Sequence, residues 1–360
     1  MEGLGGMEGL RVGVIGCGYW GSKHVRVLQS TAWVDRVVAI DGIAERLGAM
    51  VDAFPKMQGS CFRDLESALD HIDALVIATP PSSHAPLALA AIAAGKSVLV
   101  EKPLATSVAD SDAMIASARD NGVTLMVGHT FEYNAAVWKT RELIETGELG
   151  RVHFLDSARL NLGLYQPDVD VIWDLAPHDV SIFNHLLQAT PSSVQAWGAR
   201  HAHPRLYDVA HIHLDYADLG VAASIHVSWL DPCKVRRTTV VGDRKMLVYN
   251  DMLEAERIRI FDKGVDSEPM FNGAAEAPMS YRIGDTHAPF VKFHEPLAYQ
   301  DQHFVNCIVE GATPVTDGDA GRRVVAVLEA AHVSLEEQRQ VEIERVLPSM
   351  DSRMPLGVGS

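Results

Sequence analysis

Two segments of the sequence carry side chains suited to proton transfer, and one of them holds an acid and a histidine. Asp174 and His178 are four residues apart, so on a helix they share one face. Histidine titrates near neutrality and can take the proton of an alcohol as a hydride leaves the carbon. Pro177 fits such a helix if it lies in the first turn. Alone, an Asp/His pair is more often a capping or packing pair.

The other segment, Glu101-Lys102-Pro103, follows a predicted buried strand at 97–100. In open α/β sheets, ligands bind beyond the carboxyl ends of the strands. A lysine there can point at a reacting carbon–oxygen bond, and the bond to Pro103 can adopt the cis form. Alone, the same pattern also fits a surface lysine after a strand.

A glycine motif near the start, Gly16-Cys17-Gly18-Tyr19-Trp20-Gly21, predicts a dinucleotide site. It follows one predicted strand and opens a helix, so Gly18 would let the backbone approach a pyrophosphate at the helix N-terminus. Asp41 comes about 20 residues after Gly21, the offset at which an acid accepts hydrogen bonds from the adenosine ribose. A carboxylate there would repel a 2′-phosphate, so we predict NAD, with NADP as the less favoured cofactor. With this turn present, the lysine and the histidine favour catalysis over packing.

The composition is that of an acidic globular protein. The chain has 31 Lys and Arg residues against 47 Asp and Glu, which argues against nucleic acid or an anionic membrane as the main partner. Residues 1–10 lack the pattern of a signal peptide, and the most apolar segment, 87–95, is too short to span a bilayer. The four cysteines are far apart, so no disulfide framework or zinc–thiolate site is expected. We therefore expect a cytoplasmic protein.

Two histidine pairs have the spacing of ligands on one face of a strand. His201 and His203 form the first pair, and His211 and His213 the second. Two adjacent strands could bring such pairs together around a metal. The second pair alternates with apolar residues, however, as the polar face of a half-buried strand does. We therefore predict no metal site.

The elements that must position these residues change character near residue 128. Before it, short apolar strands alternate with helices, which predicts an α/β Rossmann domain over 9–128 with a parallel sheet. The predicted strands are 10–15, 36–40, 74–78, 97–100 and 123–127, and the predicted helices are 22–30, 86–94 and 108–121.

After it, strands follow one another without helices between them. This predicts a C-terminal α+β substrate-binding and oligomerisation domain over 129–345 with a large, open, mainly antiparallel sheet. An exposed apolar sheet face needs cover, so we expect a homodimer or homotetramer. The predicted strands are 152–160, 193–203, 210–216, 222–230, 236–241, 246–250 and 256–261, and the helices are 135–148, 172–188, 296–310 and 320–340. The tail, 346–360, is expected to be disordered.

Taken together, these motifs resemble the family of glucose–fructose oxidoreductase, inositol dehydrogenase and MocA proteins over most of the chain. The resemblance rests on the glycine turn, the segments 79–84 and 128–134, Glu101-Lys102-Pro103, and the acid–histidine pair. It implies NAD(P)-dependent oxidation of a secondary hydroxyl to a ketone, or the reverse, on a sugar, amino sugar, sugar nucleotide or cyclitol. It also implies that Lys102 and His178 are catalytic and that Asp174 assists.

The resemblance implies further contacts with cofactor and substrate. The expected cofactor-binding residues are Gly16, Gly18, Tyr19, Trp20, Gly21, Asp41, Thr79, Pro80, His84, Glu101 and Lys102. The expected substrate-binding residues are Asn134, Arg159, Asn161, Tyr165, Asp174 and His178. Glu132 stands where many members carry a basic residue, so the substrate is expected to lack the anionic group usually met there. The segment 159–173 looks most like branches acting on amino-sugar precursors or sugar nucleotides, some in antibiotic pathways.

Three alternatives stay open at this point. The first is an NADPH-dependent ketosugar reductase that works in the opposite direction, and a titration with both nucleotides separates it. The second is a nucleotide-sensing protein without turnover, which would require loss of the lysine or the histidine, although both are present. The third is a hydrolase that uses the bound nucleotide as a redox cofactor.

Overall fold

The chain folds into two compact units. The computed structural model describes residues 9–163, 165–166, 168–266 and 280–343, and the predicted tail at 346–360 lies outside this part. Within the described residues, the first unit comprises 9–130 and 295–326, and the second comprises 131–294 and 327–343. The predicted second domain, 129–345, includes residues 295–326, whereas the structure groups this segment with the first unit.

The first unit is built on a six-stranded parallel sheet with the order β3-β2-β1-β4-β5-β6. Every residue of β4, β5 and β6 is buried, which requires cover on both faces and confirms the predicted Rossmann architecture. The strands are β1 (Leu10–Ile15), β2 (Val34–Ile40), β3 (Cys61–Phe62), β4 (Ala74–Ile77), β5 (Ser97–Glu101) and β6 (Leu125–Gly128). The helices are α1 (Tyr19–Leu28), α2 (Ala44–Ala53), α3 (Leu65–Ala68), α4 (His84–Ala93), α5 (Val108–Asp120) and α8 (Pro296–Glu310).

The strand order reverses between β1 and β4, and this reversal locates the ligand site. The chain builds the sheet outward from β1 in one direction, and then from β4 in the other. In such sheets the crevice at the carboxyl ends of the strands on either side of the reversal receives the ligand. The glycine turn follows β1 and Thr79 follows β4, so both lie at this crevice.

Helix α8 joins the first unit because it contacts α1. The ring of His24 on α1 bonds the carboxylate of Asp301 on α8, and Arg26 pairs with Glu295 at the start of α8. The side-chain oxygen of Gln302 accepts the N–H of Ala32, 2.9 Å away. These contacts join residues about 270 positions apart, so no local pattern in the sequence predicts them.

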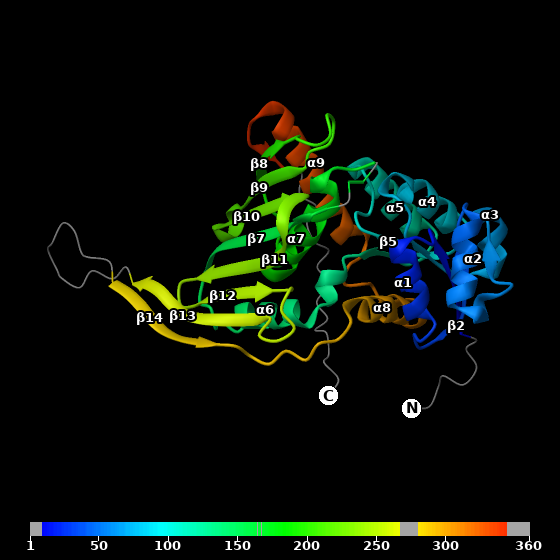
Figure 1. Ribbon diagram of the computed structural model, residues 1–360, viewed down its shortest axis with the longest axis horizontal. Coiled ribbons are helices and arrows are strands. Elements are labelled where there is room, and N and C mark those ends of the chain that lie inside the picture. The colour runs from blue at the N-terminus through cyan, green and yellow to red at the C-terminus, as the bar shows by residue number, and fades with distance from the viewer. Residues whose placement is uncertain (1–8, 164, 167, 267–279, 344–360) are drawn as a thin grey trace. The chain divides into compact units, whose positions relative to one another are not determined.

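The second unit is a nine-stranded sheet with α6 (Ala135–Glu145) and α7 (Val171–Leu187) against one face (Figure 1). Its order is β14-β13-β12-β11-β7-β10-β9-β8-β15, and the pairs are antiparallel except β7 with β10. This matches the predicted mainly antiparallel sheet. The strands are β7 (Val152–Leu162), β8 (Ser193–Ala199), β9 (Val209–Tyr216), β10 (Val221–Ser228), β11 (Leu230–Gly242), β12 (Met246–Asn250), β13 (Ile258–Asp266), β14 (Ser280–His287) and β15 (Val341–Glu342).

Helix α9 (Gly318–Glu337) begins in the first unit and ends in the second. Ser334 near its end accepts the N–H of Ala196 on β8, which ties the helix to the strand next to the edge of the nine-stranded sheet. None of the helices in the described part of the chain is long and apolar enough to cross a membrane.

Candidate active site

The glycine turn between β1 and α1 has the geometry of a phosphate cradle. Gly16 has φ +92°, a left-handed conformation that favours glycine. A Cβ on Gly21 would lie 1.9 Å from the carbonyl oxygen of Gly16, so only glycine lets α1 start this close to the turn. Among the residues that the structure describes, a Cβ on Gly18 would have no neighbour within 4 Å, and no side chain caps α1. The turn therefore leaves room for an anion at the helix N-terminus and fits the pyrophosphate of a dinucleotide.

Asp41 connects this turn to the end of β2. Its buried carboxylate accepts the N–H groups of Cys17 and Ile43, each at 2.8 Å, and Arg46 lies 3.4 Å away. A carboxylate has about four acceptor positions, so with these three donors Asp41 can still accept a bond from a ribose hydroxyl. The sequence predicts the ribose contact alone, and the structure adds a second role in holding the turn.

The remaining residues expected at the cofactor differ in exposure and in the hydrogen bonds that their side chains already make. Tyr19 and Trp20 are exposed at the start of α1, and Lys23 lies 4.6 Å from the ring centre of Tyr19. Thr79 and the exposed Pro80 follow β4. His84 is buried, and its ring nitrogens lie 2.8 Å and 2.9 Å from the carbonyl oxygens of Pro103 and Thr79. His84 therefore holds two loops together and can shape the cofactor site without a free ring nitrogen.

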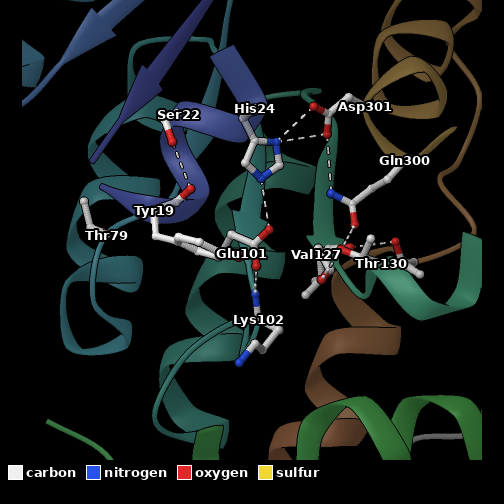
Figure 2. Close-up of polar contacts among 12 residues, drawn as sticks. Tyr19, Ser22, His24, Thr79, Glu101, Lys102, Val127, Thr130, Gln300 and Asp301 are labelled. Carbon is white, nitrogen blue, oxygen red and sulfur yellow. Dashed lines mark hydrogen bonds and ion pairs between the residues drawn. The ribbon is translucent and has the colours of Figure 1, made fainter. Parts of the chain in front are cut away.

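Lys102 lies directly beyond β5, and the peptide bond that joins it to Pro103 is cis. Its backbone N–H contacts the carboxylate of Glu101 at 3.3 Å. Figure 2 shows the Lys102 side chain extending away from His24, while the carboxylate of Glu101 points toward the His24 ring. The preceding acid is thus directed into the protein interior, and the lysine is half-buried.

Behind Glu101 lies a buried charged triad that the sequence analysis missed. His24 is fully buried, with Nε2 3.0 Å from Glu101 and Nδ1 3.0 Å from both oxygens of Asp301 (Figure 2). A neutral imidazole has one N–H and would turn a lone pair toward one carboxylate, so this geometry favours the cation. The signal available in the sequence was a histidine three residues after Gly21 on the buried side of α1.

The pKa values of the triad agree with a cationic His24. Burial alone would lower the pKa of His24, but the carboxylates of Asp301 and Glu101 outweigh it and raise this pKa to about 10. Burial also opposes the charge of Glu101, yet the hydrogen bond from His24 holds the pKa of Glu101 below its ordinary value. Burial raises the pKa of Asp301. Lys102 therefore follows a carboxylate that stays ionised.

Asp174 and His178 lie one turn apart on α7, in the second unit. The carboxylate of Asp174 accepts the indole N–H of the buried Trp229 at 3.1 Å, and the ring of His178 packs edge-on against Phe131 at 5.1 Å. Asp170 caps the helix through the N–H groups of Ile172 and Trp173, so α7 begins at Val171. The predicted helix at 172–188 thus agrees with α7 to within one residue at each end, and Pro177 lies inside the helix and not in its first turn.

The other four residues expected to touch the substrate have different surroundings in the second unit. Arg159 is buried and pairs through two hydrogen bonds with Asp179. Asn134 caps α6 through the N–H of Ala136 and donates to the hydroxyl of Tyr249 at 3.1 Å. Tyr165 packs on Trp229 and donates to Asp208, and Asn161 is half-buried on β7. Asn134 and Arg159 thus have structural bonds in addition to any contact with a ligand.

Glu132, the departure from the family pattern, is directed into the protein core. Its carboxylate lies 3.1 Å from Nδ1 of His185, and both side chains are buried. Among the residues that the structure describes, no group of three or more His, Cys, Asp or Glu side chains could hold a metal ion.

The first unit is thus the nucleotide-binding part of an oxidoreductase: an open glycine turn at the strand-order reversal, an acid at the end of β2 and a lysine after β5. Residues 10–129 match the description "Oxidoreductase family, NAD-binding Rossmann fold", and residues 137–248 match "GFO/IDH/MocA C-terminal domain". The chain belongs to the Gfo/Idh/MocA family of NAD(P)-dependent oxidoreductases.

Relatives with assigned names cover nearly the whole chain. UDP-N-acetylglucosamine 3-dehydrogenase of Acidithiobacillus ferrooxidans is 28% identical over 91% of this chain and 97% of its own length. A 1-carboxy-3-chloro-3,4-dihydroxycyclohexa-1,5-diene dehydrogenase of Comamonas testosteroni is 31% identical over 84% of this chain and 78% of its own. The structure of GenD2 from gentamicin A biosynthesis, in complex with NAD, is 26% identical and covers 94% of this chain and 97% of that one, with a TM-score of 0.78.

Proposed function

We propose that this protein oxidises a secondary hydroxyl to a ketone, or catalyses the reverse reaction, on a sugar, amino sugar, sugar nucleotide or cyclitol, with NAD as its cofactor. The observation that carries the proposal is the pair on α7, in which Asp174 is fixed by Trp229 and His178 by Phe131. Relatives named for a UDP-amino sugar and for a dihydroxylated carbon ring support this substrate range.

The side chains divide the chemistry between them. When bound, NAD accepts a hydride from the substrate carbon. Gly16, Gly18 and Gly21 would hold its pyrophosphate, and Asp41 its ribose. His178 takes the proton of the hydroxyl, and Asp174 one turn away orients and tunes it. Lys102 donates a hydrogen bond to the substrate oxygen and stabilises the charge that develops there.

Matched substitutions test these roles. His178→Ala and Lys102→Ala should each lower kcat by at least about 1,000-fold and change the affinity for NAD less than about threefold. Lys96→Ala at the other end of β5 and His153→Ala, an exposed position on β7, serve as controls. The measurement is NADH formation over a panel of inositols, nucleotide sugars and aminoglycosides. Turnover like that of the wild type in either active-site variant contradicts the assignment.

A second candidate, an NADPH-dependent ketosugar reductase, uses the same residues in reverse. Arg46 lies 3.4 Å from Asp41 and could offset a 2′-phosphate, which is the observation in its favour. The Asp41 carboxylate, which accepts the N–H of Cys17 in the glycine turn, favours NAD because it would repel a 2′-phosphate. Steady-state kinetics with both nucleotides separates the two.

We further propose that the protein works in the cytoplasm as a homodimer or homotetramer. The nine-stranded sheet exposes large apolar side chains, among them Trp197, Tyr281 and Ile283, and a second copy could cover them. Light scattering on the purified protein tests the oligomeric state.

A further inference from the structure

Two arginines face each other on neighbouring strands of the nine-stranded sheet. Arg159 on β7 is the register partner of Arg236 on β11. Both guanidinium groups lie over the ring of Phe131, Arg159 at 4.5 Å and Arg236 at 5.8 Å from its centre. Like charges directly across a strand pair destabilise a sheet, so the fold gains nothing from this pairing by itself.

The carboxylates nearby leave the cluster positive. Asp179 neutralises Arg159 through two hydrogen bonds. Asp251 is shared, because Arg257 and Arg236 both pair with it. Three guanidinium groups therefore share two carboxylates, and one positive charge is not compensated within this set.

Arg236 is the member whose hydrogen-bonding groups are least committed. Asp251 lies 3.3 Å from Arg236 but 3.0 Å from Arg257, and it also accepts the hydroxyl of Tyr249 at 2.9 Å. Within the described residues, Nε and Nη2 of Arg236 have no hydrogen-bond acceptor. The side chain of Arg236 is 37% exposed, compared with 7% for Arg159, so a ligand can reach it.

Phe131 connects this cluster to the histidine of the proposed active site. The ring that receives both guanidinium groups also packs against His178, with ring centres 5.1 Å apart. A six-membered ring that lies near Phe131 can place a hydroxyl at His178 and an anionic substituent at Arg236. Planar guanidinium groups bind carboxylate and phosphate with paired hydrogen bonds.

We propose that Arg236 binds an anionic substituent, a carboxylate or a phosphate, on the substrate whose hydroxyl meets His178. The inference rests on the proposed function and specifies its substrate class. It reverses the expectation drawn from Glu132, which is directed toward His185 in the core and does not report on the charge of the substrate. Arg159, whose charge is offset by Asp179, supports the ring of Phe131.

Binding to the NAD-loaded protein tests the proposal without requiring turnover. The probes are D-glucose, D-glucuronate and D-glucose 6-phosphate, with myo-inositol and quinate as a second neutral and anionic pair, each measured by calorimetry. We expect the wild type to bind at least one anionic probe about 10- to 100-fold more tightly than its neutral counterpart. Comparing glucuronate with the phosphate identifies which anion is preferred.

The neighbouring arginine provides the matched control. Arg237 is the next residue on β11 and points to the opposite face of the sheet, where Asp156 lies 3.8 Å away. Arg236→Gln should abolish the preference for the anion, Arg236→Lys should retain part of it, and Arg237→Gln should leave it unchanged. Circular dichroism checks that each variant is folded.

The outcomes separate this inference from the proposed function. Equal affinity for neutral and anionic probes in the wild type, or a preference that survives in Arg236→Gln, overturns the role of Arg236. Binding of an anionic probe that depends on Arg236, without NADH from any hydroxylated compound, supports the role of Arg236 and contradicts the proposed oxidation.

Discussion

The buried triad of His24, Glu101 and Asp301 predicts a large and pH-dependent effect of one conservative substitution. Asp301→Asn keeps the shape and one acceptor oxygen but removes a negative charge 3.0 Å from the His24 ring. At this distance, with an effective dielectric constant of about 20, the attraction is about 5.5 kcal/mol before desolvation is subtracted. Removing one partner of a buried pair costs about 3–5 kcal/mol. Because Asn still accepts a hydrogen bond, we expect Asp301→Asn to lower the free energy of unfolding by about 3 kcal/mol, the lower end of this range.

A second pair between the same two segments supplies the control. Arg26 on α1 pairs with Glu295, the residue before α8, and these side chains are 50% and 44% exposed. Exposed pairs contribute about 0–1 kcal/mol, so Glu295→Gln should destabilise the protein by less than about 1 kcal/mol. Urea unfolding followed by circular dichroism gives the change in the free energy of global unfolding. Hydrogen exchange of peptides from α1 and α8 gives the change in local opening of these two helices.

The pH dependence adds a second signature. The folded-state pKa of His24 is about 10, above its ordinary value of 6.5. Stabilisation by the cation is therefore fully present below pH 6.5 and is lost as the pH rises toward 10. The difference between the wild type and Asp301→Asn should be largest near neutrality and shrink toward pH 10. A loss equal to that of Glu295→Gln, or one independent of pH, would refute a cationic His24.

Other predictions concern the cofactor site and the acid on α7. Gly21→Ala places a Cβ 1.9 Å from a backbone oxygen and should abolish NAD binding in a fluorescence titration, with at least about 3 kcal/mol of destabilisation. Gly18→Ala has open space, so the unfolding midpoint should stay unchanged while NAD binds at least about tenfold more weakly. Asp41→Ser should raise the kcat/KM ratio of NADP to NAD by about tenfold or more. Trp229→Phe removes the donor to Asp174 and should lower kcat about tenfold with little change in KM; an unchanged kcat would show that this hydrogen bond does not orient the acid.

Much of the fold follows from local patterns in the sequence. The apolar segments at 10–15 and 246–250 and the helix at 296–310 have the predicted bounds, because period and capping are properties of neighbouring residues. The two-residue strand β3 and helix α2 were not predicted. A strand of two residues has too few positions to show a period, and α2 has two buried residues among ten.

The sequence predicted those site residues that belong to a motif directly after a strand. Gly16 to Gly21, Asp41 and Lys102 come at strand ends, so their location follows from the order of the elements. The triad of His24, Glu101 and Asp301 could not be predicted from the sequence, because Asp301 and His24 are 277 positions apart in the chain. The register of β7 with β11, which brings Arg159 opposite Arg236, is also a long-range property that a single sequence does not reveal.

The proposed oxidation transfers a hydrogen from the hydroxylated carbon of the substrate to NAD, and isotope labelling follows this hydrogen. The purified protein is incubated with NAD and with sugars, nucleotide sugars and cyclitols that carry deuterium on the hydroxylated carbons, and the reduced cofactor is analysed by mass spectrometry. We expect deuterium in the NADH from at least one of them, and NADH formation at least about 1,000-fold slower with the His178→Ala and Lys102→Ala proteins. NADH without deuterium, or labelled NADH formed at the wild-type rate by either variant, would contradict it.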